Sequence, residues 1–331
     1  MSSYYNYYEN DNPWDETIAL DYRWFTRSFE KIFFATFAFD CLTFLALSSF
    51  LAWACTIRPS SQPLKGVITV LVLWICAQLL SLIYEILELA SAVVKQYYVI
   101  DFMLLEFFSV VSSCVLFLVF YQTIHLLLDR LTDSGKPYAP LRIIHWVLLG
   151  LVTVLSLAEF AVYVAVEYKS VEGTIAYKII DSWRKLYSAR CIIYFVMAFE
   201  IFVWTIFVTV KAGTHRFTSR MPLFSLIAAS LCWFGYNLMW GIVAIRFYLT
   251  ITVASGPDYL SIIESVFTFV FVVGIFTGLL LCLMNWFKLG GDHDKPPTSA
   301  QHPYDNSQMF QTWQPHQQQQ QQPQLVQHHQ S

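Results

Sequence analysis

Seven long apolar segments are the feature that most restricts what this chain can fold into. An α-helix needs about 20 apolar residues to cross the hydrocarbon core of a bilayer, and each segment reaches that length. A helix also satisfies its own backbone hydrogen bonds, as lipid requires. The sequence therefore predicts an all-α polytopic membrane protein, a seven-transmembrane helix bundle. The segments span residues 32–55, 67–93, 102–128, 143–166, 187–211, 222–248 and 259–287.

The composition agrees with a bilayer as the surrounding solvent. Of the 331 residues, 56% are hydrophobic and 13% are charged, whereas a soluble chain has about 25% charged residues. Lipid is therefore the first partner that we expect. The net charge of -3 gives no attraction to nucleic acid, which we do not expect as a partner.

The chain divides into three parts by composition. Residues 1–31 form a polar tail, in which residues 16–30 predict an amphipathic helix at the membrane surface. Residues 32–288 hold the bundle, and residues 289–331 predict a disordered, glutamine-rich tail. The polar start has no signal peptide, so we expect the first apolar segment to act as an uncleaved signal anchor.

The connections predict an orientation. On the side of the N-terminus, the two short loops carry only Lys95 and Arg246. The short loops of the other side are richer in Lys and Arg, and such loops stay in the cytoplasm. We expect the plasma membrane, with the N-terminus outside and the C-terminus in the cytoplasm. In the longer fourth connection, I-I-D-S-W-R-K-L-Y at 179–187 predicts an interfacial helix.

Proline and glycine positions predict continuous, closely packed helices. None of the 12 prolines lies inside an apolar segment, and Pro222 stands at a helix start, where proline is tolerated. Gly274 and Gly278 form a G-x-x-x-G pattern that lets two helices approach closely. We interpret this pattern as packing within the bundle rather than as a dimer contact.

Acidic residues inside the apolar segments are the main functional signal. A charged side chain at the centre of a bilayer costs at least about 2.5–3.5 kcal/mol, so it must face a neighbouring helix or a cavity. Gln78, Ser81, Glu85 and Glu88 are spaced 3, 4 and 3 apart, which places them on one helix face. Most of the other segments carry similar polar stripes. We expect these stripes to turn inward.

The depth of these groups predicts a one-sided site. At about 1.5 Å per residue, the acids lie near the midplane or toward the leaflet of the N-terminus. We therefore predict an acid-lined exoplasmic vestibule for a cationic or polar small ligand, with Arg190 and Arg246 as counter-ions. The predicted ligand-binding residues are Asp40, Glu85, Glu88, Glu106, Glu159, Glu200, Asn237, Arg246 and Glu264. The alternative is that these groups only hydrogen-bond the helices together.

The residue patterns that retinal binding, zinc hydrolysis and nucleophilic catalysis require are missing from the apolar segments. The last segment has no lysine before Lys288 for a retinal Schiff base. A seven-helix zinc hydrolase needs about three histidines, whereas only His125 and His145 lie within segments, and we interpret both as interfacial or core residues. The seven cysteines form no C-x-x-C pair, and no G-x-S-x-G or H-E-x-x-H motif occurs. We therefore expect no enzyme activity, no cofactor and no metal.

Three kinds of function fit this pattern. A receptor-like sensor fits best, because a ligand entering the vestibule meets the acids. An ion- or proton-coupled transporter, a channel subunit or a lipid-handling protein is the alternative. An open pore is disfavoured, because the cytoplasmic halves of the segments are nearly all apolar. A structural scaffold is the third.

Two short motifs are similar to those of rhodopsin-like G-protein-coupled receptors. Asp129-Arg130-Leu131, at the inner end of the third segment, resembles the Asp/Glu-Arg-Tyr motif, whose arginine gates coupling. Cys232-Trp233-Phe234-Gly235 in the sixth segment resembles the Cys-Trp-x-Pro switch. Leu131 and Gly235 depart from the two motifs, and the last segment has no Asn-Pro-x-x-Tyr. The resemblance implies a cytoplasmic signalling partner.

Over residues 32–288, the chain also resembles the receptor-like or uncharacterised seven-helix membrane proteins of filamentous fungi. The resemblance lies in the architecture and in the Tyr-, Gln- and Pro-rich style of the tails. It implies a surface-membrane protein that acts as a sensor, and it adds no site residue.

Overall fold

The computed structural model describes residues 29–57, 62–89, 95–131, 138–171, 177–213, 220–249 and 260–285. These residues are almost entirely helical, and seven of the helices are long and apolar enough to cross a membrane. The predicted all-α, seven-helix architecture is thus confirmed. The helices are α1 (Phe29–Thr56), α2 (Gln62–Leu89), α3 (Lys95–Arg130), α4 (Ala139–Val171), α5 (Tyr177–Gly213), α6 (Met221–Val243), the π-helix η2 (Ala244–Leu249) and α7 (Leu260–Met284).

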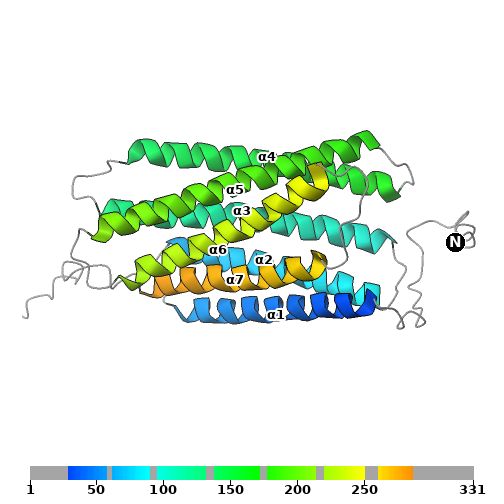
Figure 1. The fold of residues 1–331 in the computed structure, drawn as a ribbon, viewed down its shortest axis with the longest axis horizontal. Coiled ribbons are helices and arrows are strands. Elements are labelled where there is room, and N and C mark those ends of the chain that lie inside the picture. The colour runs from blue at the N-terminus through cyan, green and yellow to red at the C-terminus, as the bar shows by residue number, and fades with distance from the viewer. Residues whose placement is uncertain are drawn as a thin grey trace, which may run out of the picture. The chain divides into compact units, whose positions relative to one another are not determined.

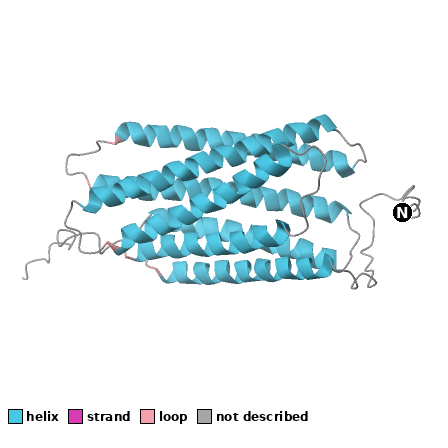
Figure 2. Ribbon diagram, viewed as in Figure 1, coloured by secondary structure: helices cyan, strands magenta, loops and turns pink. Residues whose placement is uncertain are grey.

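The seven helices lie side by side and form a closed ring (Figure 1). Each helix packs against the next in the sequence, and α7 packs against α1. Contacts of α3 with α5 and of α2 with α7 cross the interior. The colour gradient in Figure 1 shows that the direction of the chain alternates from one helix to the next, and Figure 2 shows helices throughout the bundle, with only short loop segments among the described residues. The N-terminal end of the bundle is defined here as the end where α1, α3, α5 and α7 begin.

Aromatic side chains fill the centre of the bundle. Phe117 on α3 and Trp233 on α6 are fully buried, with ring centroids 5.1 Å apart. The ring of Tyr194 on α5 also packs against Phe117, with ring centroids 5.2 Å apart. Large apolar side chains such as Val154 and Val210, each 68% exposed, cover the outside. An apolar exterior of this kind is what contact with lipid tails requires.

The start of α5 corrects one prediction. Residues 179–187 do not form a separate interfacial helix, because they are the first turns of α5. Helix formation continues through the segment since it contains no proline or glycine, and Lys185 and Asp181 form an i,i+4 ion pair of 2.6 Å. Trp183 therefore lies on the face of α5 that contacts Glu159 on α4.

The sixth transmembrane segment begins at a proline and ends in a π-helix. Pro222 lies in the first turn of α6, as predicted, after the N-cap residue Arg220. The end of that transmembrane segment departs from a regular α-helix, because Ala244–Leu249 adopt the π-helix η2. Such π-turns widen the helix locally and are frequent near functional sites.

Glycines permit the close packing of α6 against α7. A Cβ atom on Gly278 would lie 2.6 Å from the backbone oxygen of Ser225 and 2.8 Å from the Cβ of Ala229. A Cβ on Gly274 would overlap the side chain of Cys232. The interpretation of G-x-x-x-G as internal packing is thus confirmed. The predicted surface helix at 16–30, apart from its last two residues, and the predicted tail at 289–331 lie outside the described residues.

Candidate functional site

A buried arginine joins three helices in the N-terminal half of the bundle. Nη1 of Arg190 on α5 lies 2.7 Å from Oε1 of Glu106 on α3 and 3.2 Å from Oε2 of Glu159 on α4. Arg190 is 7% exposed, and Glu159 is completely buried. These three residues are called the Arg190 cluster below. The structure thus places Arg190 as a counter-ion of two of the predicted acids.

Aromatic neighbours on α5 hold the Arg190 cluster. Trp183 donates a hydrogen bond from Nε1 to Oε1 of Glu159 at 2.7 Å. The guanidinium carbon of Arg190 lies 5.1 Å from the ring centroid of Tyr187 and 5.9 Å from that of Tyr194, within the range of cation–π attraction. The four residues share one face of α5 because they are spaced 4, 3 and 4 apart.

A cavity of about 210 Å³ opens beside this cluster. Asn237 lines it from α6, and its Nδ2 atom donates to the backbone oxygen of Trp233 at 2.7 Å, which orients the amide. The cavity therefore combines one guanidinium, one carboxyl group, one amide and several aromatic rings. Its lining residues are Leu105, Glu106, Ser109 and Ser113 of α3, Tyr187, Arg190, Cys191 and Tyr194 of α5, and Tyr236, Asn237 and Trp240 of α6.

A second acidic group, the Asp40 cluster, lies between α1, α2 and α7. Gln78 donates from Nε2 to the backbone oxygen of Asp40 at 3.4 Å, and the side chains of Glu85, Gln78 and Ser265 lie close enough to the carboxyl group of Asp40 to interact with it. Glu85 is 7% exposed. Two carboxyl groups can share a hydrogen bond only when one of them carries the proton. This cluster matches the interpretation of intramembrane polar groups as bonds between helices.

The remaining predicted site residues lie apart from these clusters. Glu264 on α7 lies close enough to Tyr248 on η2 for their charges to interact. Arg246 is exposed on η2, so of the two predicted counter-ions the structure places only Arg190 among the acids. Glu88 lies in α2, but its side chain is outside the described part of the chain.

The acids thus form separate clusters and do not line the single chamber expected from the sequence. The predicted depth of each acid in the bilayer rests on the constant rise along a helix, and it stays a prediction. It carried no information on the rotation of each helix about its axis. That rotation decides which acids share a face and which are separated by a neighbouring helix.

Glu200 belongs to a third cluster, the His145 cluster, toward the opposite end of the bundle. Nε2 of His145 on α4 lies 2.9 Å from Oε1 of Glu200 on α5, and Nδ1 of His145 lies 2.9 Å from Nε2 of His125 on α3. Tyr121 donates to Oε2 of Glu200 at 2.8 Å. His145 is 1% exposed and His125 is 8% exposed. The core interpretation of the two histidines was correct in burial, but their contact joins different helices and no pattern within one helix predicts it.

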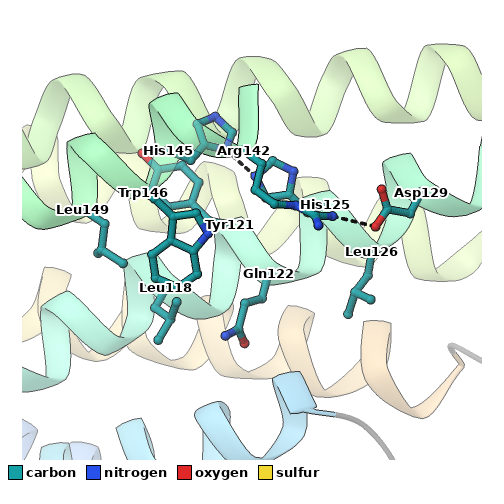
Figure 3. Close-up of a pocket in the computed structure, with 10 residues that line it drawn as sticks. All are labelled: Leu118, Tyr121, Gln122, His125, Leu126, Asp129, Arg142, His145, Trp146 and Leu149. Atoms are coloured by element: carbon teal, nitrogen blue, oxygen red, sulfur yellow. Dashed lines mark hydrogen bonds and ion pairs between the residues drawn. The ribbon is translucent and has the colours of Figure 1, made fainter. Parts of the chain in front are cut away.

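A larger cavity, of about 330 Å³, lies against the His145 cluster between α3 and α4 (Figure 3). Figure 3 shows His125 joined to His145, and Arg142 joined to Asp129 beside them. The Arg142–Asp129 ion pair is 2.7 Å long. The cavity is lined by Leu118, Tyr121, Gln122, His125, Leu126, Asp129, Arg142, His145, Trp146 and Leu149.

One further buried acid lies outside the predicted site residues. Asp101 on α3 is 8% exposed, and it lies one residue before the predicted start of the third segment. Within the described ranges, no group of three His, Cys, Asp or Glu side chains is placed to hold a metal ion.

Comparisons with known proteins identify no relative, so the function must be inferred from the fold and its clusters. No family model matches the chain, and neither a curated protein nor a solved structure matches it significantly. Seven apolar helices of membrane-spanning length decide the class. The chain is a multi-pass membrane protein.

Proposed function

We propose that this protein is a receptor-like sensor whose ligand is a small organic cation. The observation that carries the proposal is the cavity beside the Arg190 cluster. Glu106, Arg190 and Asn237 converge there with the aromatic rings of Tyr236 and Trp240. A concave, aromatic-lined pocket with few polar groups is the usual form of a small-molecule site.

The charges of the Arg190 cluster favour a cationic ligand. Two carboxyl groups face one guanidinium, so when both are ionised the cluster retains one negative charge. A ligand ammonium group beside Glu106 neutralises that charge. Tyr and Trp faces attract the same group by about 0.5–2 kcal/mol each, depending on desolvation. The cavity volume of about 210 Å³ limits the ligand to a small molecule.

Packing supports a route from the pocket to the bundle centre. Tyr236 lines the cavity and stacks on Trp233, with ring centroids 5.6 Å apart and planes 11° apart. Trp233 in turn packs on Phe117. A ligand that moves Tyr236 must therefore repack this buried pair. The basic short loops favour an exoplasmic position for this pocket. The resemblances imply a surface membrane and a cytoplasmic signalling partner.

Transport is the less favoured function. Arg190 and Glu200 are ten residues apart on α5, which corresponds to about 15 Å along the helix. Phe117, Met197 and Trp233 lie in the buried apolar core. A transporter needs polar groups through both halves, and these side chains fill the centre with apolar volume instead.

Ligand binding by the purified protein in lipid nanodiscs tests the proposal. Primary and quaternary ammonium compounds are titrated while tryptophan fluorescence is recorded, because Trp240 lines the pocket. We expect saturable binding by one compound class and at least about a tenfold weaker affinity in Glu106→Gln, from loss of a charge-assisted contact.

Glu264→Gln is the matched control, because it removes a carboxyl group from the same half of the bundle but outside the cavity lining. We expect it to bind like the wild type. Absence of saturable binding across the panel, or equal weakening in both variants, would refute the proposed pocket.

A further inference from the structure

The His145 cluster is a linear hydrogen-bonded chain of titratable groups. Its order is His125, His145 and Glu200, and successive atoms are 2.9 Å apart at both contacts. The three side chains come from α3, α4 and α5, so each contact also joins two helices. Tyr121 donates to the second oxygen of Glu200 and stacks on His145, with ring centroids 4.2 Å apart.

This order of groups accommodates one added proton without losing a hydrogen bond. A neutral imidazole donates from one ring nitrogen and accepts at the other. With Glu200 ionised, His145 donates from Nε2 to Glu200 and accepts at Nδ1 from Nε2 of His125. Both directions are assigned from the chemistry of the partners.

A proton added to Nδ1 of His125 reverses both contacts. The Nε2 proton of His125 then passes to Nδ1 of His145, and the Nε2 proton of His145 passes to Glu200. The product is a neutral carboxylic acid and two neutral imidazoles. One proton has been gained, and every contact in the chain persists with donor and acceptor exchanged.

The cavity between α3 and α4 gives this chain a source of protons. His125 lines it, and its volume of about 330 Å³ has room for several water molecules, each of which occupies about 30 Å³ in the liquid. The groups that act on His125 are His145 and Arg142 on α4, Asp129 on α3 and Glu200 on α5. Those that contact Glu200 are His145, Tyr121 and Trp204.

The proton does not continue beyond Glu200 toward the Arg190 cluster. Met197, Ala198 and Ile201 on α5 are at most 2% exposed and belong to the apolar core. The cluster therefore has one side open to the cavity and one side closed by the apolar core, which is the arrangement of a storage site rather than of a transmembrane path.

We propose that the His145 cluster is a proton-binding site that takes one proton from the α3–α4 cavity and holds it on Glu200. The site is independent of the ligand pocket beside Arg190. Because the chain joins three helices, its protonation state sets the polarity of the contacts that hold this end of the bundle.

Infrared difference spectra of the protein in nanodiscs, recorded on acidification from about pH 7 to 3, a range that includes the ordinary titration of a carboxyl group near pH 4, test the site. We expect the wild type to gain a carboxylic-acid carbonyl component that Glu200→Gln lacks, read as the difference between the two proteins because other carboxyl groups of the bundle contribute to the same band. Proton uptake over the same interval, measured with an indicator dye, falls by about one per protein in that variant.

Tyr121→Phe tests the same site with a smaller change, since it removes one oxygen and keeps the ring on His145. Loss of a hydrogen bond to the carboxylate raises the midpoint of the carbonyl band by about one pH unit. His215→Gln, in the connection between α5 and α6, is the control and leaves the midpoint unchanged. A carbonyl band of equal amplitude in Glu200→Gln and wild type, or an identical midpoint in Tyr121→Phe and wild type, overturns the proposal.

Discussion

Arg190 shows how one residue organises the N-terminal half of the bundle. Its guanidinium contacts carboxyl groups from two other helices, while two tyrosine rings of its own helix flank it. The sequence predicted these residue types at this depth, because unpaired charges inside a bilayer are too costly to be accidental. It did not predict that Glu106 and Glu159 share one partner, because that pairing requires three helices to be rotated toward each other.

Removal of this arginine leaves two buried carboxyl groups without their cation. We expect Arg190→Met to lower the free energy of unfolding by about 3–5 kcal/mol, as observed when one partner of a buried ion pair is removed. Thermal unfolding in nanodiscs measures the effect. The double variant Arg190→Met/Glu106→Gln is expected to recover part of the loss, and a double variant no more stable than Arg190→Met would contradict this account.

At the level of helices, the sequence predicted the position of each transmembrane helix but not the start of α5 or the π-helix that follows α6. Each predicted apolar segment corresponds to a helix, because hydrophobicity over about 20 residues is a sufficient signal for spanning. The predicted start of α5 was wrong, since Asp181, Arg184 and Lys185 indicated a surface segment although they continue the helix beyond the apolar region. The π-helix η2 also gave no sequence signal, because no proline or glycine marks it.

The α6–α7 contact gives a prediction at this scale. Gly278→Ala places a methyl group within 2.6 Å of the backbone oxygen of Ser225, which cannot move without displacing α6. We expect a loss of about 1–3 kcal/mol in unfolding free energy from overpacking. Gly150→Ala is the matched control, because a Cβ on Gly150 meets nothing within 4 Å. Equal melting temperatures for the two variants would show that the α6–α7 contact is looser than described.

For the whole molecule, the proposals assign different tasks to the two ends of the bundle. The Arg190 cluster and its cavity lie toward the N-terminal end, and the His145 cluster lies toward the other. The sequence predicted the acids of the first end but not the histidine contacts of the second. The two histidines lie on different helices, α3 and α4, and only the assembled ring brings them together.

The orientation of the bundle is testable by cysteine labelling in cells. In a Cys55→Ser background, we expect Glu172→Cys, between α4 and α5, to react with a membrane-impermeant maleimide in intact cells. Thr214→Cys, between α5 and α6, should react only after permeabilisation, because basic short loops stay in the cytoplasm. The reverse pattern would place the Arg190 cavity on the cytoplasmic side.

The contact between α1 and α7 also has a consequence for biosynthesis. The side chain of Ser265 on the last helix lies close enough to the carboxyl group of Asp40 on the first to interact with it. A ribosome makes α1 more than 200 residues before it makes Ser265. The nascent first helix must therefore wait in the membrane with an incompletely satisfied carboxyl group, and closure of the ring by the last helix completes the assembly.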